Sequence, residues 1–184
     1  MLEPVTFVAA TAGDLPALHA LVHGAYRGDS ARRGWTHEAD LLDGQRIDRP
    51  SLEAALVDTA QLILLARQDD ILTGCVQISD RGDGLAYLGM LSVDPARQAG
   101  GLGRRLVAAA EAAALDRFGA NRMEMTVIVQ RAELIAWYER LGYKRTGETR
   151  PFPATDPRFG LPRRDDLAFT VLVRHLADES PGPT

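Results

Sequence analysis

The sequence predicts an α/β domain built on a mixed β-sheet, and three features of its 184 residues carry that prediction. Two β-like runs, 61–67 and 71–79, flank a short polar turn at 68–70, which is a hairpin signal and indicates antiparallel pairing. A helical pattern separates the β-like runs 85–93 and 122–129, and a helical crossover of that kind joins parallel strands. The composition, 46% hydrophobic and 25% charged, is typical of a globular protein.

The N-terminal half begins with a β-like run over 5–10, after which Thr11 to Asp14 offer an N-cap for a helix over 15–25. Apolar residues at helical spacing support that helix. The polar stretch that follows contains one short helical piece near Glu38 to Leu42. A further helix is expected over 52–59, before the hairpin.

In the second half, Asp94-Pro95 ends the strand over 85–93, because proline cannot donate a hydrogen bond to a sheet. A helix with an apolar stripe is expected from Leu102 to Phe118, with Gly119 as its stop. A Pro-rich loop, 151–166, is too long for a simple connection and points to a functional role. The remaining expected elements are a strand over 122–129, a helix over 132–141, and strands over 143–149 and 167–173.

We expect one domain over residues 1–176 and a disordered tail over 177–184. The net charge of −4 argues against a nucleic-acid partner, since such proteins usually carry a basic excess. The single Cys75 excludes an internal disulfide and a multi-cysteine zinc site, and we expect no bound metal. With no apolar run of about 18 residues and no signal peptide, we expect a cytoplasmic protein without a membrane partner.

The segment from Gln98 to Arg104 carries the strongest chemical signal, because glycines lie where a strand gives way to a helix. Helix N-termini present unpaired backbone N–H groups and the positive end of the helix dipole, and glycine lets an anion approach them closely. Arg104 and Arg105 fall in the first turn, where cations are disfavoured by about 0.3–1 kcal/mol each, and an external anion would relieve this. The alternative is a plain strand-to-helix connection with a solvated arginine face. A Walker A loop is excluded, since no Gly-Lys-Ser/Thr follows.

The run Gln98-Ala99-Gly100-Gly101-Leu102-Gly103 resembles the Q/R-x-x-G-x-G/A signature of the GNAT superfamily of N-acetyltransferases. The strand before it, the alanine-rich helix after it and the run Trp137 to Tyr143 also match that family's pattern. The resemblance covers nearly all of residues 4–176. It implies a mixed, mostly antiparallel sheet of six to seven strands, with a central parallel pair splayed for acetyl-CoA and about four flanking helices.

The resemblance implies acetyl-CoA as the cosubstrate, held between the splayed strands. The backbone of Leu91, Ser92 and Val93 would pair with the pantetheine amides as an added strand does. The amides from Gln98 onward would hold the pyrophosphate, which is the anion site expected from the local sequence. The residues concerned are Gln98, Ala99, Gly100, Gly101, Leu102, Gly103 and Arg104.

Tyr138 matches the tyrosine that many family members use as a general acid toward the leaving thiolate. The alternative is a core tyrosine that packs on the sheet through its ring. Arg131 stands where many members have an asparagine that contacts the cofactor, so it is a cofactor-binding candidate with an altered role. Tyr87 stands where protein-lysine acetylating members have a glutamate base, which weakens a histone-type mechanism.

In this family the first helices and their loop cover the acceptor site. Trp35, Glu38, Asp40 and Arg46 could therefore line that site. The substrate-binding candidates are Trp35 and Glu38, together with Tyr87 from the strand before the signature. The alternative for Glu38 is a solvated residue in the first turn of a short helix. In the loop 151–166, two phenylalanines either wall an acceptor pocket or anchor the loop.

The resulting functional hypothesis is an N-acetyltransferase in which an acceptor amine attacks acetyl-CoA directly. A small-molecule amine is favoured over a peptide or protein amine. The competing class is a non-catalytic acyl-CoA-binding sensor on the same fold. A nucleotide-phosphate hydrolase is disfavoured because the glycine-rich segment lacks the lysine of a Walker A loop. A homodimer is compatible with the sequence.

Overall fold

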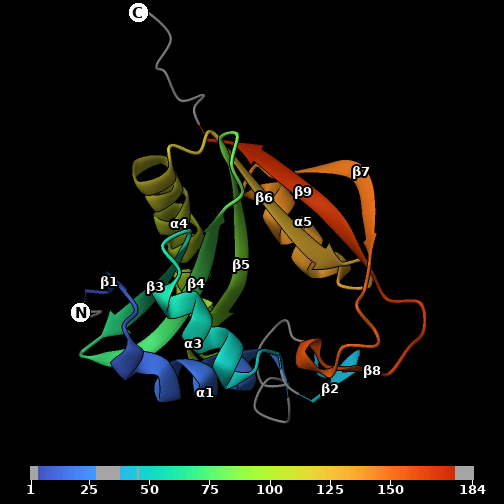
Figure 1. The fold of residues 1–184 in the computed structure, drawn as a ribbon, viewed down its shortest axis with the longest axis horizontal. Helices are drawn as coiled ribbons and strands as arrows, with labels where there is room; N and C mark the ends of the chain where they lie inside the picture. The colour runs from blue at the N-terminus through green and yellow to red at the C-terminus, as the bar shows by residue number, and fades with distance from the viewer. Residues whose placement is uncertain (1–3, 28–37, 45, 177–184) are drawn as a thin grey trace, which may run out of the picture.

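The computed structural model describes residues 4–27, 38–44 and 46–176. Its centre is a seven-stranded sheet in the order β1-β3-β4-β5-β6-β9-β7 (Figure 1). All neighbouring strands pair antiparallel except β5 and β6, which are parallel. The predicted mixed sheet with a central parallel pair is therefore confirmed. The strands are β1 (Thr6–Ala9), β3 (Gln61–Gln68), β4 (Ile71–Asp80), β5 (Leu85–Val93), β6 (Arg122–Ile128), β7 (Lys144–Pro151) and β9 (Ala168–His175).

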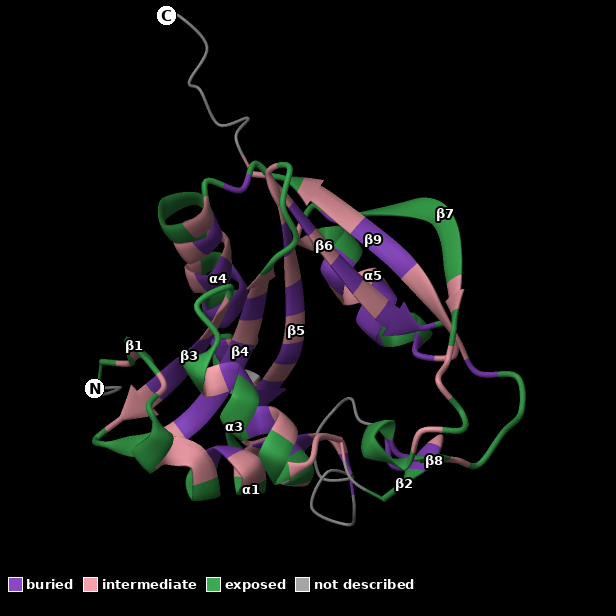
Figure 2. Ribbon diagram, in the orientation of Figure 1, coloured by how far each residue is buried: buried purple, intermediate pink, exposed green. Residues whose placement is uncertain are grey.

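Among the described residues, four α-helices flank this sheet, and they explain why its strands β3 and β4 are buried on both faces. The helices are α1 (Leu15–Tyr26), α3 (Arg49–Val57), α4 (Leu102–Phe118) and α5 (Ala132–Arg140). Ile63 and Leu65 of β3 pack in the cluster that includes α1 and α3, whereas Leu64 and Ala66 pack in the cluster that includes α4 and α5. The buried bands of β3, β4 and β5 in Figure 2 mark this two-sided packing.

The helix ends follow the capping chemistry of the sequence. The Asp48 carboxylate accepts a hydrogen bond from the Ser51 backbone N–H at 2.6 Å, and Pro50 lies in the first turn of α3, so that helix begins before the expected position 52. Gly119 ends α4 in the left-handed conformation (φ 61°), as predicted. A 3-10 helix, η2 (Pro95–Gly100), lies between β5 and α4.

The two parallel strands pair over only three residues and then separate. The register joins 85–87 of β5 to 122–124 of β6, and Figure 1 shows the strands diverging beyond that point. Farther along β5 the pairing with β4 shifts, and Met90 adopts a positive φ of 53°. This bulge turns Met90 toward the α1 side, although Leu88, two residues earlier, packs on the α4 side.

The prediction of a short helix near Glu38 to Leu42 is wrong. The backbone N–H groups of Leu41 and Leu42 both bond to the Glu38 carbonyl, which makes a single turn. The chain then forms β2 (Leu42–Asp43), which pairs antiparallel with β8 (Leu161–Pro162) of the Pro-rich loop. Leu42 is buried with Ile128 in a small separate cluster, so a non-local contact overrides the local helical signal.

Candidate active site

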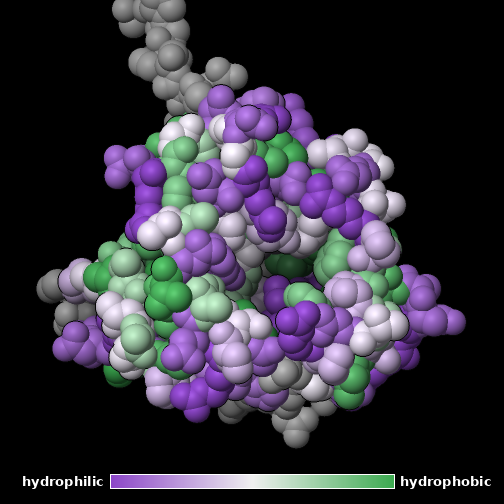
Figure 3. All heavy atoms as spheres, in the orientation of Figure 1, coloured by the Kyte–Doolittle hydropathy of each residue, from purple (hydrophilic) through white to green (hydrophobic). Residues whose placement is uncertain are grey.

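Two adjoining cavities open where β5 and β6 separate, and Figure 3 shows the molecule hollowed between the two halves of the sheet. The glycine-side cavity, about 240 Å³, also touches Gly101, Gly103 and Trp137. The arginine-side cavity, about 410 Å³, also touches Arg46 and Tyr87. Both cavities are lined by the same five residues, which mark the place where they meet. These are Tyr26, Leu91, Arg131, Leu134 and Tyr138.

The glycine-side cavity lies at the N-terminus of α4. Gly101 has a left-handed backbone (φ 72°), and a Cβ added there would meet nothing within 4 Å. At Gly103 an added Cβ would lie 3.5 Å from the Trp137 ring. The small residues therefore keep backbone N–H groups open to an anion.

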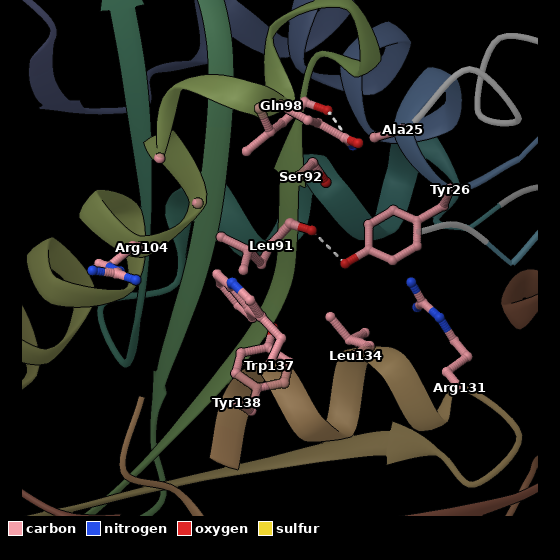
Figure 4. A pocket seen from close by; sticks show the side chains of 13 residues that line it. Ala25, Tyr26, Leu91, Ser92, Gln98, Arg104, Arg131, Leu134, Trp137 and Tyr138 are labelled. Carbon is pink, nitrogen blue, oxygen red and sulfur yellow. Dashed lines mark hydrogen bonds between the residues drawn. The ribbon is translucent and has the colours of Figure 1, made fainter. Parts of the chain in front are cut away.

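Most of the predicted cofactor residues line this cavity, as Figure 4 shows for several of them. The Gln98 side-chain amide donates to the Val93 carbonyl at 3.4 Å and braces the turn that follows β5. Gly100 is exposed on η2, which also includes Ala99, and Leu102 is buried in the core. The predicted residues that line the cavity are Leu91, Ser92, Val93, Gln98, Gly101, Gly103, Arg104 and Arg131.

Tyr138 lies on α5 at the junction of the two cavities and is 5% exposed. Its ring makes edge contacts with Trp137 and Tyr143, with centroids 4.9 and 5.9 Å away. Burial raises the pKa of the Tyr138 phenol, so the group keeps its proton. Among the described residues, none hydrogen-bonds this hydroxyl. The ring is thus part of the core while the side chain also borders the cavities.

Tyr26, the last residue of α1, was not singled out by the sequence. Its hydroxyl donates to the Leu91 backbone carbonyl, and Figure 4 shows this bond across the glycine-side cavity. Burial raises the pKa of Tyr26 to about 12. The helical spacing from Leu18 and Val22 places Tyr26 on the buried face of α1, and that periodicity was the available signal.

Glu38 is a buried ion-pair partner, not the solvated first-turn residue of a helix. Its carboxylate lies 2.8 Å from Arg27 Nη2 and 3.2 Å from Arg131 Nη1, and all three residues are buried. Burial by itself raises the pKa of Glu38, but the guanidinium groups of Arg131, Arg46 and Arg27 hold it below its ordinary value. An ionised carboxylate shared by two guanidiniums is a weak proton acceptor. Arg27 was not predicted, whereas Arg131 was predicted as a cofactor contact and borders both cavities.

Tyr87 lines the arginine-side cavity just where the parallel strands part. Its hydroxyl lies 2.6 Å from the Thr126 hydroxyl of β6, and the Arg81 guanidinium lies 4.8 Å from the ring centroid. Phe152 and Phe159 of the Pro-rich loop also line this cavity. Trp35, the remaining substrate-binding candidate, lies outside the described residues.

Among residues 4–27, 38–44 and 46–176, no cluster of three or more histidine, cysteine or acidic residues is placed to hold a metal ion. Within the same ranges, no helix has the length and apolar character needed to cross a membrane.

The comparisons with known proteins agree with this geometry. The sequence model of the acetyltransferase (GNAT) family matches residues 22–143, which is more than half of the chain. The chain therefore belongs to the GNAT family of acetyltransferases. No curated protein sequence matches it.

Many solved structures share the fold. The ribosomal-protein-S18-alanine N-acetyltransferase from Escherichia coli is 18% identical with a TM-score of 0.68, covering 98% of this chain and 99% of its own. The yncA protein of Salmonella typhimurium, solved with its cofactor acetyl-CoA, is 21% identical with a TM-score of 0.68, covering 99% of both chains. The spermidine N-acetyltransferase from Vibrio cholerae, solved with CoA and spermine, is 16% identical with a TM-score of 0.69, covering 94% of this chain and 95% of its own.

Proposed function

We propose that this protein transfers the acetyl group of acetyl-CoA to the primary amine of a small molecule by direct attack. The observation that carries the proposal is the meeting of two cavities at Leu91 and Tyr138. One cavity has the glycine-rich helix N-terminus suited to a diphosphate, and the other is open for an acceptor. A cytoplasmic location and a homodimer stay predictions.

The cosubstrate has a natural place in the glycine-side cavity. The backbone N–H groups around Gly101 and Gly103 would take the diphosphate, with Arg104 beside them. The end of β5 from Leu91 to Val93 lies past its last pairing with β6, so its backbone is available to the pantetheine amides. A structure of the yncA protein contains acetyl-CoA on the same fold, which supports this placement.

The reaction forms one bond and breaks one. The amine nitrogen attacks the thioester carbonyl carbon, and the backbone near Val93 stabilises the negative charge that develops on the carbonyl oxygen. The C–S bond then breaks, and Tyr138 donates its proton to the departing thiolate. Burial keeps the Tyr138 phenol protonated until the thiolate forms beside it, and the same low-dielectric surroundings raise the basicity of that thiolate so that it can take the proton.

The amine must reach the carbonyl without its own proton, and Glu38 is poorly suited to remove it. Its carboxylate is shared by Arg27 and Arg131, which hold it ionised at acidic pH. The amine therefore reacts from its neutral fraction. The proton that the attacking nitrogen loses as the amide forms leaves through the open arginine-side cavity, and Tyr138 regains its proton from solvent before the next turnover. Such a reaction accelerates as pH rises toward the pKa of the amine.

A peptide or protein amine is the second candidate, because one neighbour of the same fold acts on alanine of ribosomal protein S18. The neighbour from Vibrio cholerae acts on spermidine, which is small. A cavity of about 410 Å³ is in the range of small-ligand pockets and favours the small acceptor.

The test is Tyr138→Phe, measured by thiol release from acetyl-CoA with a panel of amines. We expect kcat to fall by about 10²–10⁴-fold while the Kd for CoA stays unchanged, since the phenyl ring keeps its contacts with Trp137 and Tyr143. Unchanged kcat in the variant would remove Tyr138 from the mechanism. CoA binding without turnover on any amine would instead support the non-catalytic sensor.

A further inference from the structure

We infer that the acceptor amine also carries an anionic oxygen group, a carboxylate or a phosphate, which binds Arg46 and Arg131 in the arginine-side cavity. This inference rests on the proposed function, because it concerns the amine that the reaction consumes. It follows from the charges that line the cavity, from their position near the junction of the two cavities, and from the apolar residues that share the lining.

The described lining of the arginine-side cavity has more positive than negative charge. Its cations are Arg27, Arg46, Arg81, Arg131 and Arg158, and its carboxylates are Glu38 and Asp48. Arg158 is held by Asp156 at 2.7 Å, and the Asp48 carboxylate caps α3.

Glu38 is left as the carboxylate that pairs with Arg27 and Arg131, and it also attracts Arg46, so one negative charge faces three guanidinium groups. Among the described residues, no carboxylate lies within 4.0 Å of the Arg46 guanidinium, although Arg46 is partly buried. Taking a charge out of water is unfavourable unless an opposite charge accompanies it. An anion on the substrate would supply that charge.

The excess positive charge lies next to the point where the amine must react. The Arg46 guanidinium lies 5.2 Å from the centroid of the Tyr26 ring, and that of Arg131 lies 5.8 Å from the same centroid. The hydroxyl of Tyr26 bonds to Leu91, where the two cavities meet. Both guanidinium groups thus lie against the tyrosine whose hydroxyl reaches the junction of the cavities. An α-amino acid carries its anion on the carbon next to the one that holds the amine, so it would place the two groups close together there.

The rest of the cavity gives the acceptor an apolar surface. Phe152 and Phe169 pack together with ring centroids 5.4 Å apart, and both line the cavity. A polyamine would meet like charges at the arginines, which costs binding energy. We therefore expect an apolar α-amino acid to be acetylated and spermidine to be rejected.

The experiment compares matched amines by thiol release from acetyl-CoA. The probes are L-phenylalanine with L-phenylalaninamide, O-phosphoethanolamine with ethanolamine, and spermidine alone. We expect the anionic member of at least one pair to have a kcat/KM, calculated on the concentration of neutral amine, about tenfold or more above that of its partner. The first pair reports on a carboxylate and the second on a phosphate.

Arg46→Gln should erase that preference, mainly by raising KM for the anionic member. The matched control is Arg117→Gln, which makes the same charge change on α4, outside both cavities. Preference for the neutral members or for spermidine would overturn the inference and leave the proposed function standing.

If no probe releases thiol, melting temperatures measured with CoA present decide the inference. A larger rise with an anionic probe than with its neutral partner, lost in Arg46→Gln, would support the anion site while the proposed function fails. Equal rises, or none, would overturn the inference.

Discussion

The side-chain hydroxyl of Tyr26 donates a hydrogen bond to the backbone carbonyl of Leu91, which ties the end of α1 to the bulge in β5. Leu91 lies beyond the last residue of β5 that pairs with β6. A backbone carbonyl placed there needs a partner when it leaves water, and Tyr26 provides one. A carbonyl oxygen can accept two hydrogen bonds, so a bound ligand can share Leu91 with Tyr26.

Tyr26→Phe should lower the free energy of unfolding by about 0.5–1.5 kcal/mol, because the Leu91 carbonyl loses its partner while the ring still fills its space. Urea unfolding measures the change. Tyr138→Phe is the matched control, since no described residue bonds to the Tyr138 hydroxyl, and it should leave stability nearly unchanged. An equal loss in both variants would show that the Tyr26 bond contributes nothing specific.

Glu38→Gln should destabilise the protein by about 3–5 kcal/mol at neutral pH, because Arg27 and Arg131 would remain buried beside a neutral amide. Asp43→Asn is the control, since the carboxylate of Asp43 pairs with Arg163 at the surface and should matter little. Urea unfolding measures both variants.

The effect of Glu38→Gln should depend on pH in a direction that the ion pairs set. The pKa of the Glu38 carboxyl is lowered in the folded protein. The stability that Glu38 contributes is therefore fully present above the ordinary glutamate pKa of about 4.3 and is lost as pH falls through the folded pKa. The gap in unfolding free energy between parent and variant should therefore shrink in acid. A gap that stays constant to acidic pH would contradict the assignment.

Gly101→Glu should abolish binding of CoA, which isothermal titration measures. The substitution places a negative charge at the helix N-terminus where the diphosphate is expected. Gly101→Gln is the matched control, because it adds the same bulk and the same strain at positive φ without the charge. We expect Gln to weaken binding and Glu to abolish it. Equal affinities in the two variants would place the diphosphate elsewhere.

Gly160→Ala should lower Tm and raise KM for the acceptor, because an added Cβ would collide with Nη1 of Arg27. Arg27 would then have to move away from Glu38. Gly147→Ala is the control for backbone strain alone, since Gly147 also has a positive φ and its added Cβ meets nothing within 4 Å. The account is wrong if both variants lose the same stability and keep the same KM.

The sequence predicted the elements whose signals are local. The strand over 85–93 and the helix over 102–118 lie at their expected bounds, because a proline and a left-handed glycine end them. The parallel pairing followed from the helix between two strands.

What the sequence did not show depends on contacts between distant segments. The local sequence at Glu38 indicates a helix. The residue instead lies in a buried turn, where its carboxylate pairs with Arg27 and with Arg131, which is 93 residues later in the chain. Nothing in the residues around Met90 indicates a positive φ there, since methionine has no preference for it. The hydrogen bond of Tyr26 to Leu91 joins residues that are 65 positions apart, next to that bulge.

The arginine-side cavity has an outer wall that does not come from the seven-stranded sheet. Residues 38–44 and 46–48 and the loop 152–163 form it. The two segments are joined through β2 and β8, and Arg27 donates to the carbonyls of both Asp43 and Phe159. The glycine-side cavity is built by β5, η2, α4 and α5 instead. If these two outer segments were exchanged together, the selectivity for the acceptor amine would change while the proposed CoA-binding residues stayed the same. Acceptor selectivity in this fold can therefore evolve separately from cofactor binding.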